Sequence, residues 1–396
     1  MSYYISFYTL ILFFICTFAP NKESIVENCI SNDRLSIMNN NRYCVIMCGG
    51  VGSRFWPFSK AAKPKQFIDF FGTGRSLLQM AFDRLQGIVP VDNIILITNE
   101  SYEPLIKEQL PEIKSEQILL EPARRNTAPC IAWAAHHIKA INPDAKMMVA
   151  PSDHLIINVQ QFQQSVIKAF EFIESRDALV TMGIKPSRPE TGYGYIQVGE
   201  HIEGDFSAVK TFTEKPDEDL ARVFLKSGEF FWNSGMFFWS ADSILNALNA
   251  CAPEVNAVFE RGIQYFGTPQ EREYIDSNFE ACPSISIDFA VMEKAPNVYV
   301  ETVDFGWNDL GTWRSLYEYS PKNKDGNVTQ NCKALMFNSH NNIVAIKGDK
   351  LIVASGLDGY IVADVDDALL IVPLEEEQRI KQYVNDVKSK FGDKYL

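Results

Sequence analysis

The stretch Val45–Phe67, VIMCGGVGSRFWPFSKAAKPKQF, places a glycine-rich segment directly behind a short apolar run. The apolar run, Tyr43–Cys48, predicts a buried strand, and the glycines behind it predict a tight turn. Glycine lets backbone N–H groups approach a phosphate with no Cβ in the way. Arg54 adds a planar guanidinium and Lys65 an ammonium group. The stretch therefore predicts a phosphate-binding loop where a strand ends.

Two common phosphate loops do not fit this stretch. The dinucleotide fingerprint G-x-G-x-x-G needs a third glycine, and Phe55 stands where it should follow Gly50 and Gly52. The P-loop needs Gly-Lys where this sequence has Arg54-Phe55. What remains is G-G-x-G-x-R, followed by Lys65. A tight turn with two surface cations is the alternative without a phosphate.

Strand and helix patterns alternate along the first half of the chain. Apolar runs such as NIILITNE and ALVTMGI predict strands, and SLLQMAFDRLQGI and NTAPCIAWAAHHIKAI predict helices entered through Ser76 and Asn126. Such alternation predicts an α/β fold, a Rossmann-like mixed, mainly parallel sheet flanked by helices. Ligands of these sheets lie beyond the carboxyl ends of the strands. The glycine loop and Ser152-Asp153-His154, behind the predicted strand KMMVA, both fall there.

Three segments are expected along the chain. Residues 1–40 are a leader, residues 41–320 a catalytic domain, and residues 321–396 a small β-rich domain with a terminal helix. Between Tyr193 and Trp313 the strands are short and aromatic-rich, and we interpret them as insertions that wall a pocket over the sheet. Beyond Pro321, short strands with Gly-Asp and Asp-Gly turns precede a charged helix.

The leader opens with twenty mostly apolar residues, MSYYISFYTLILFFICTFAP. No Lys or Arg precedes the apolar run, and no A-x-A-like site follows it, so a signal peptide fits poorly. Our hypothesis is that the native protein starts at Met38, or that residues 1–37 are a disordered leader. A membrane anchor is the alternative to the cytoplasmic location that we expect.

Charge and cysteine content exclude several classes of protein. The formal net charge is -13, which argues against nucleic acid as a partner because phosphate backbones require a basic surface. The eight cysteines are scattered, and Cys44 and Cys48 lack a second pair for a zinc site. We expect reduced, mostly buried thiols.

Several motifs, in a fixed order, resemble the nucleotide-sugar pyrophosphorylases, and specifically the mannose-1-phosphate guanylyltransferases. They are GGVGSRFWPFSKAAKPKQF, EPARRNTAPCIA, APSDHLI, TGYGYI, FTEKP, FWNSGMF and DFGWNDLGTW. The resemblance covers Tyr43 to Trp313 and is weak in the tail. It implies a GT-A-like nucleotidyltransferase fold. In short members of the family the tail is similar to a small left-handed β-helix that helps to form a homodimer or higher homo-oligomer.

The implied reaction transfers GMP from GTP to α-D-mannose 1-phosphate, giving GDP-mannose and pyrophosphate. The nucleophile is a phosphate oxygen that is largely ionised at neutral pH, so no general base is needed. The sequence agrees, because it has only five histidines and no evident nucleophile–histidine set. Catalysis would rest on positioning and on neutralisation of charge by Mg²⁺, Lys and Arg during in-line attack.

The resemblance assigns roles to residues in each motif. The expected nucleotide-binding residues are Gly49, Gly50, Gly52, Ser53, Arg54, Lys65, Arg125, Asn126 and Thr127. Those expected to bind the sugar phosphate are Gly192, Gly194, Glu214, Lys215 and Asn233. Arg54, Lys65 and Lys215 are the expected catalytic cations. Asn126 and Thr127 can also cap the following helix, and Tyr193, Trp232 and Phe237 fit a core or a sugar platform equally.

Mg²⁺ takes one or two carboxylates and fills its other positions with phosphate and water. Asp153, at the end of a predicted strand, is the first expected ligand, and the resemblance implies Asp309 as the second. Asp304 and Asp288 are weaker candidates. His154 is expected to be a structural neighbour, and His136 and His137 to pack within a helix.

Two alternatives stay open. A glucose-1-phosphate uridylyl- or thymidylyltransferase would use the same chemistry, and the motif spacing does not exclude it. A non-catalytic regulatory subunit that binds nucleotide-sugar should have lost loop or metal residues, and none is missing. The tail of some 70 residues is too short for the cupin barrel of a phosphomannose isomerase module. We therefore expect guanylyltransferase activity only.

Overall fold

Alternate residues of the first strand face two different hydrophobic clusters. The computed structural model describes residues 39–50, 52–348 and 350–396. Strand β1 (Arg42–Met47) points Val45 into a cluster on one face of the sheet and Ile46 into a cluster on the other. Both side chains are fully buried. This is the burial expected of a strand at the centre of a covered sheet.

The central sheet has nine strands in the order β3-β2-β1-β4-β9-β6-β10-β8-β7. Their bounds are β2 Ile94–Asn99, β3 Ile118–Glu121, β4 Lys146–Pro151, β6 Leu179–Ile184, β7 Tyr195–Glu203, β8 Phe206–Thr213, β9 Phe230–Ser240 and β10 Val298–Val303. The first four strands in this order are parallel, β9 is antiparallel to both of its neighbours, and β6 and β10 are parallel. The predicted mixed α/β sheet is confirmed.

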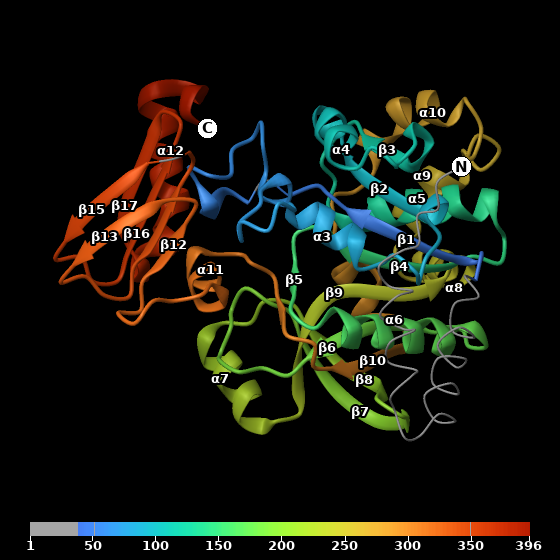
Figure 1. Ribbon diagram of the computed structural model, residues 1–396. Helices are drawn as coiled ribbons and strands as arrows, with labels where there is room; N and C mark the ends of the chain where they lie inside the picture. Colours follow the sequence, from blue (N-terminus) through green and yellow to red (C-terminus); the bar gives the residue numbers. More distant parts are fainter. Residues whose placement is uncertain (1–38, 51, 349) are drawn as a thin grey trace, which may run out of the picture. The chain divides into compact units, whose positions relative to one another are not determined.

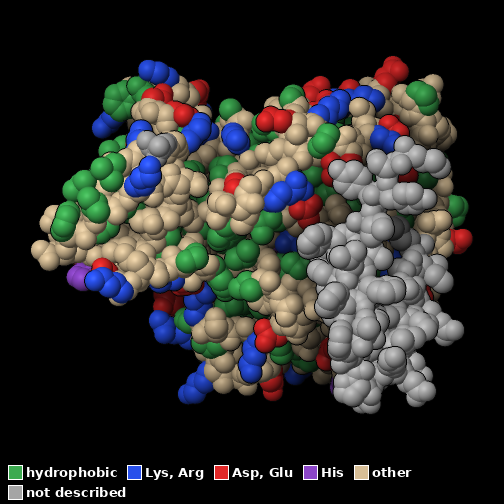
Figure 2. Space-filling view, viewed as in Figure 1, with side chains coloured by type: hydrophobic (Ala, Val, Ile, Leu, Met, Phe, Trp, Pro, Cys, Tyr) green, Lys and Arg blue, Asp and Glu red, His purple; other side chains and the backbone are tan. Residues whose placement is uncertain are grey.

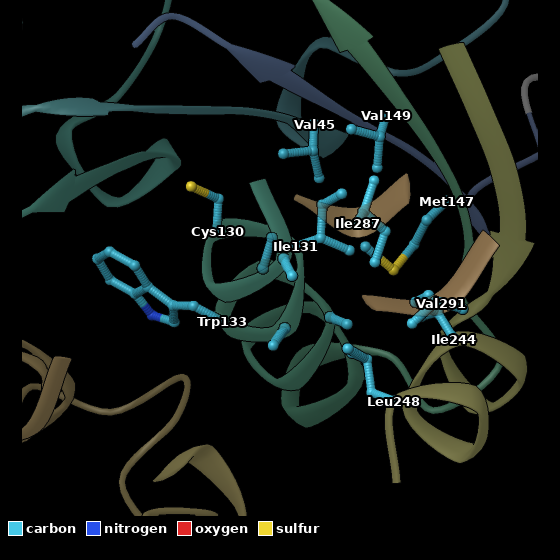
Figure 3. Close-up of a cluster of buried hydrophobic side chains, with 14 of the residues drawn as sticks. Val45, Cys130, Ile131, Trp133, Met147, Val149, Ile244, Leu248, Ile287 and Val291 are labelled. Atoms are coloured by element: carbon cyan, nitrogen blue, oxygen red, sulfur yellow. The ribbon is translucent and has the colours of Figure 1, made fainter. Parts of the chain in front are cut away.

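Helices cover both faces of this sheet (Figure 1). Their bounds are α3 Leu77–Asp83, α4 Glu103–Gln109, α5 Thr127–Ile141, α6 Val159–Glu174, α7 Glu218–Ser227, α8 Ala241–Cys251, α9 Pro253–Glu260 and α10 Glu271–Asn278. Helices α5, α8 and α9 pack on the face that holds Val45. Figure 3 shows the side chain of Ile131, from α5, beside that of Val45. Helices α3, α4 and α6 pack on the face that holds Ile46.

Helix α3 begins where the sequence predicts. Ser76 accepts a hydrogen bond from the Gln79 N–H, and Gln79 Oε1 accepts one from the Ser76 N–H, which completes a capping box. Asn126 likewise caps α5, because its side chain accepts from the Thr127 N–H.

The aromatic-rich middle segment differs from our expectation. Its strands β7 to β10 do not lie over the sheet as insertions but extend the sheet itself. The reason is main-chain pairing, because β9 lies between β4 and β6 and pairs with both. Phe237 and Phe238 of β9 pair with residues of both neighbouring strands. Asn233, on the same strand, lies opposite Gly183 of β6.

The strands beyond Pro321 form two stacked sheets. One is β12-β14-β16-β17 and the other is β13-β15. Their bounds are β12 Val328–Gln330, β13 Lys333–Phe337, β14 Ile343–Ile346, β15 Leu351–Ser355, β16 Tyr360–Val365 and β17 Ala368–Pro373. Strands β12 to β16 alternate between the two sheets, β17 joins β16 in the same sheet, and every pairing except β16–β17 is parallel. This is the path of a short solenoid; its left-handed sense stays a prediction.

The C-terminal strands share a hydrophobic core with the glycine-loop segment. Phe55 and Trp56 pack in one cluster with Trp313 of α11 (Trp313–Tyr319) and with Ile343 and Ile361. Helix α12 (Ile380–Phe391) closes this cluster. Residues Asn40–Leu396 form one compact unit, so the expected division at residue 320 stays a prediction.

Two further expectations concern cysteines and membranes. The six cysteines of the described ranges are free, and four of them are buried, as predicted. Across residues 39–50, 52–348 and 350–396, no helix has the length and apolar character needed to span a bilayer. The predictions for residues 1–37 and for a start at Met38 lie outside the described residues.

Candidate active site

The glycine loop leaves β1 at the carboxyl edge of the sheet and turns sharply at Gly52. Gly49 and Gly50 are exposed, so their backbone is open to a ligand. Gly52 has φ +67°, and a Cβ there would lie 2.8 Å from Cγ of Lys65. Glycine is therefore required at position 52 both by backbone conformation and by contact. The short helix η1 (Ser53–Phe55) follows.

Gln66 holds this loop, a role that sequence reasoning missed. Its Nε2 donates to the carbonyl oxygens of Cys48 at 2.9 Å and Gly50 at 3.0 Å. The side chain is buried. Its position directly behind Lys65 in the quoted stretch was the available signal.

Lys65 links the glycine loop to both carboxylate segments that we expect to bind metal. Its Nζ lies 3.0 Å from Asp153 Oδ2 and donates to the carbonyl oxygens of Asp309 at 2.9 Å and Leu310 at 3.1 Å. The residue is only 8% exposed. An ammonium has three N–H donors, so all of them are occupied by the protein. The predicted contact of Lys65 with phosphate stays a prediction.

Arg54 points toward the C-terminal segment. Its Nε donates to Gln378 Oε1 at 3.0 Å. The side chain is half-buried and does not line the cavity described below. The predicted phosphate contact of Arg54 stays a prediction, as does that of Ser53.

Asp153 and His154 follow β4 directly. Burial raises the pKa of Asp153, but the Lys65 ammonium and other favourable contacts outweigh it, so the net pKa is below its usual value. Burial lowers the pKa of His154 to about 4, and its Nδ1 accepts from Trp307 Nε1 at 3.1 Å. Asp153 is thus an anion and His154 is neutral at pH 7.

Asp309 lies in a turn in which neighbouring groups hold its carboxylate by hydrogen bonds. Its Oδ1 accepts from Tyr193 Oη at 2.7 Å and from the Gly311 N–H at 3.0 Å. A Cβ on Gly311 would lie 2.6 Å from Asp309 Oδ2, so a side chain there would displace the Asp309 carboxylate. Burial, together with the Asp309 charge, raises the pKa of Tyr193 well above its usual value, which keeps the phenol a hydrogen-bond donor.

The donor chemistry at Asp153 and Asp309 fits a divalent cation that also binds phosphate. Lys65 contacts the carboxylate of Asp153 and the main chain of Asp309, so the two segments meet at one ammonium group. Within the described ranges no cluster of three or more His, Cys, Asp or Glu side chains could hold a metal by itself. Two carboxylates suit Mg²⁺ when a triphosphate supplies further oxygens.

A cavity of about 250 Å³ opens beside these residues, at the carboxyl edge of the sheet. It is lined by Met47, Thr127, Pro151, His154, Gly192, Tyr193, Gly194, Glu214, Lys215, Asn233, Ser234, Gly235, Phe237, Ile287, Asp288, Trp307 and Asp309. All five residues that we expect to bind the sugar phosphate are among them, although they come from three separate motifs. The structure therefore brings these five residues together.

The polar side chains of the cavity hold one another in place. Asn233 Oδ1 accepts from Thr181 Oγ1 at 2.9 Å, which leaves its Nδ2 to donate to Asp288 Oδ1 at 2.9 Å. Glu214 forms an ion pair with Lys215, whose φ is +44°. A Cβ on Gly194 would lie 2.9 Å from Glu214 Oε2, so glycine leaves room for that carboxylate.

Asp288, a weak metal candidate in the sequence, is placed in this cavity instead. It opens the π-helical turn η7 (Asp288–Met292). Burial, with the nearby Glu214 charge, raises the pKa of Asp288 to about 6. The carboxyl groups of Asp288 and Glu214 line one small cavity and suit the recognition of hydroxyl groups. Nothing in the sequence indicated that Asp288 would line this cavity.

The segment EPARRNTAP runs from the end of β3 into α5. Thr127 Oγ1 accepts from the Ile287 N–H at 2.8 Å, which ties this segment to η7. Arg125 Nε is buried and has no hydrogen-bond partner in the described part of the chain. Glu121, which the sequence did not single out, accepts from Cys130 Sγ at 2.7 Å and lies 3.9 Å from the Cβ position of Gly49.

Known proteins resemble this chain in sequence and in fold. Residues 43–326 match the family described as Nucleotidyl transferase. The chain belongs to the nucleotidyl transferase family. This nucleotidyl transferase is 38% identical over 364 residues to a mannose-1-phosphate guanylyltransferase of Klebsiella pneumoniae, covering 89% of this chain and 75% of the relative.

Two solved structures resemble this nucleotidyl transferase at 28% identity. One is described as a mannose-1-phosphate geranyltransferase from Thermus thermophilus, with a TM-score of 0.79 over 88% of this chain and 99% of the other. The second is described as a mannose-6-phosphate isomerase from Helicobacter pylori, with a TM-score of 0.54 over 68% of this chain and 99% of the other.

Proposed function

We propose that the protein transfers GMP from GTP to α-D-mannose 1-phosphate, giving GDP-mannose and pyrophosphate. The observation that carries the proposal is the convergence of the predicted sugar-phosphate residues on one cavity, beside Asp153, Lys65 and the glycine loop. The name of the Klebsiella pneumoniae relative favours mannose and guanine.

In the proposed mechanism a phosphate oxygen of the sugar phosphate forms a bond to the α-phosphorus of GTP. The bond between that phosphorus and the bridging oxygen of the β-phosphate breaks, and pyrophosphate leaves with the electron pair. No side chain needs to remove a proton, because the attacking phosphate is already ionised. The low pKa and the occupied Nδ1 of His154 agree with this.

Each group of residues has a part in this mechanism. The glycine-loop backbone binds the triphosphate, with Arg54 on the leaving phosphates, and Lys215 neutralises the sugar phosphate. Glu214 and Asp288 accept hydrogen bonds from sugar hydroxyls, and the amide of Asn233 donates to one. Asp153 and Asp309 would hold Mg²⁺, which when bound neutralises phosphate charge that otherwise opposes in-line attack. Lys65 orients Asp153 for that role.

Pyrophosphate release from the full chain tests the proposal. GTP, UTP and dTTP are each supplied with mannose 1-phosphate or glucose 1-phosphate, with Mg²⁺ present. We expect kcat/KM for GTP with mannose 1-phosphate to exceed every other pair by at least about tenfold. A preference for UTP or dTTP with glucose 1-phosphate contradicts the substrate assignment. Absence of turnover with every pair supports a regulatory subunit.

The Helicobacter pylori structure raises isomerisation as a second activity. We propose that this chain lacks it, because the described residues beyond Pro321 form only six short strands, α12 and two short helices, η8 (Leu374–Arg379) and η9 (Gly392–Tyr395). Incubation with mannose 6-phosphate, read as fructose 6-phosphate formed, should give no product above the enzyme-free rate. Formation of fructose 6-phosphate by the unaltered protein and also by Asp153→Asn would contradict the proposal that the chain lacks isomerase activity.

We also propose that the chain forms a homo-oligomer through the C-terminal strands. The outward side chains of β13 and β15 include Leu335, Phe337, Leu351 and Val353, which are 52% to 62% exposed. Figure 2 shows hydrophobic side chains gathered on this outer edge, at the left of the view. An apolar face of this kind can pack against its own copy about a two-fold axis. Light scattering should give a dimer or larger assembly, and Leu351→Lys with Val353→Lys should dissociate it.

A further inference from the structure

A second cavity, of about 610 Å³, lies at the β3 edge of the central sheet. It is enclosed by β3, by the last turns of α5 and by the segment that leads into α10. Its lining residues are Ile95, Ser115, Glu116, Ile118, Leu119, Leu120, Trp133, His137, Ile141, Gly267, Thr268, Pro269, Glu271 and Arg272. None of these lines the cavity beside Asp309. The proposed function therefore assigns no role to this cavity.

Hydrophobic side chains form most of the wall. Ile118, Leu119 and Trp133 are buried behind it, and Ile141 is 54% exposed at the end of α5. In Figure 3 the Trp133 ring lies on the side of α5 away from Val291. The volume is within the range of roughly 300–1,000 Å³ that is typical of small-molecule sites. Burial of an apolar ligand here would release water from an apolar wall.

A buried carboxylate organises the polar end of the cavity. Glu271 accepts from Trp133 Nε1 at 2.7 Å, from His137 Nδ1 at 2.8 Å and from the Gly267 N–H at 2.8 Å. Burial by itself raises the pKa of Glu271, but the bonds from His137, Trp133 and Gly267 lower it below its usual value. The carboxylate is therefore ionised, and its accepting positions are largely occupied by the protein.

His137 is left with one ring nitrogen for a ligand. In the neutral form of His137, the Nδ1 hydrogen points to the Glu271 carboxylate and Nε2 is a lone-pair acceptor. The side chain is 9% exposed, and the hydrogen bonds that His137 makes through its ring to the described residues use Nδ1. The neighbouring His136 differs, because its Nε2 is hydrogen-bonded to Asn256 Oδ1 at 3.0 Å. His137 is thus a buried acceptor that lines an apolar cavity.

The charges around the cavity select against an anionic ligand. Glu271 is ionised within it and Glu116 lies at its rim. Arg272, the cation of the lining, is already bound to Asp276 and to the Leu120 carbonyl oxygen. An anion would meet two carboxylates and no unpaired cation of the lining.

We propose that this cavity binds a small, uncharged, mainly apolar molecule whose N–H or O–H group donates to His137 Nε2. The proposal does not depend on the catalytic assignment. An aromatic heterocycle of the size of indole meets these requirements, and 1-methylindole has nearly the same shape without the donor. The pair therefore separates the hydrogen bond from apolar burial.

Binding of both compounds to the full chain is measured by ligand-observed NMR. We expect a Kd for indole below about 1 mM, and one at least fivefold higher for 1-methylindole, the loss expected for one unmade hydrogen bond to a buried acceptor. His137→Phe should bring the two Kd values within twofold. Ile141→Trp should fill the mouth and weaken both compounds at least fivefold.

Ile263→Trp is the matched control, since Ile263 is 60% exposed and does not line the cavity. It should leave both Kd values unchanged. If His137→Phe fails to fold, the comparison of the two compounds and the Ile141→Trp variant still test the site. Absence of indole binding at 5 mM would overturn the proposal, and so would equal affinity for the two compounds or binding that Ile141→Trp does not weaken.

Discussion

Lys65 Nζ lies 3.0 Å from Asp153 Oδ2, although 87 positions lie between the two residues in the chain. The ammonium also donates to the main chain of Asp309, so one buried cation joins the glycine loop to both carboxylate segments. A buried charge is tolerated only when it is paired in this way. The relationship makes Lys65 a positioning residue for Asp153 as well as a candidate phosphate contact.

Lys65→Met should therefore alter the pH dependence of the reaction as well as its rate. Without the ammonium, burial of Asp153 is unopposed and its pKa rises. We expect kcat/KM to fall by about 10²-fold or more, with the acidic limb of the pH profile moved to higher pH. Steady-state kinetics from pH 5 to pH 9 measure both effects. The exposed Lys63→Met is the control, and an unshifted acidic limb in Lys65→Met would remove the positioning role.

Asp153→Asn and Asp309→Asn should each reduce kcat by about 10²-fold or more if these carboxylates hold the cation. Raising the Mg²⁺ concentration should restore part of the activity, because the lost ligand weakens cation binding rather than abolishing it. Pyrophosphate release measured against Mg²⁺ concentration gives the result. Asp304→Asn, on an exposed side chain outside the cavity, should match the unaltered protein. Full activity of Asp153→Asn with the fold intact is the outcome that contradicts the metal assignment.

Gln66→Ala should weaken GTP binding without affecting the sugar phosphate. Its amide holds the carbonyl groups of Cys48 and Gly50, so its loss frees the glycine loop. We expect KM for GTP to rise about tenfold, which corresponds to roughly 1.4 kcal/mol, with KM for mannose 1-phosphate within twofold. The exposed Gln86→Ala serves as the control. An equal rise in both KM values would indicate general destabilisation instead.

Comparison of Arg54→Ala with Gln378→Ala distinguishes a phosphate contact of Arg54 from its observed hydrogen bond to Gln378. If Arg54 turns to the triphosphate, its removal should raise KM for GTP at least about tenfold, as expected for a lost charge-assisted bond. Gln378→Ala should then leave KM unchanged, since it breaks only the bond to the C-terminal segment. Equal effects of the two variants would show that Arg54 serves the packing of that segment.

Asp288 should make stability depend on pH in the weakly acidic range. Its pKa is about 6 in the folded protein, against 3.8 when exposed. Between these values the folded state binds the proton more tightly, so this group's contribution is present at low pH and is lost as the pH rises through 6. Relative to Asp288→Asn, the free energy of unfolding should fall by up to about 3 kcal/mol between pH 4 and pH 7. Urea unfolding of both proteins measures this, and parallel curves would place the Asp288 pKa at its ordinary value.

Much of the fold follows from local patterns. The alternation of apolar runs with helical spacing predicted the α/β sheet, and Ser76 and Asn126 begin their helices as expected. The strands β7 to β10 were found, but their place in the sheet was not. A strand's partners are set by main-chain hydrogen bonds between distant segments, and side-chain periodicity carries no record of them. The insertion of β9 between β4 and β6 is such a case.

The sequence by itself determined the family and the candidate site residues: the glycines, the cations and the carboxylates stand in motifs whose order resembles one family. Only the tertiary structure decided what each of them touches. Lys65 proved to be enclosed by Asp153 and two carbonyl groups, Arg54 to point at Gln378, and Asp288 to face Asn233. The reason is physical. Residue type fixes charge and hydrogen-bonding capacity, whereas burial and the distance between groups are properties of the folded chain, and those two quantities set pKa and binding.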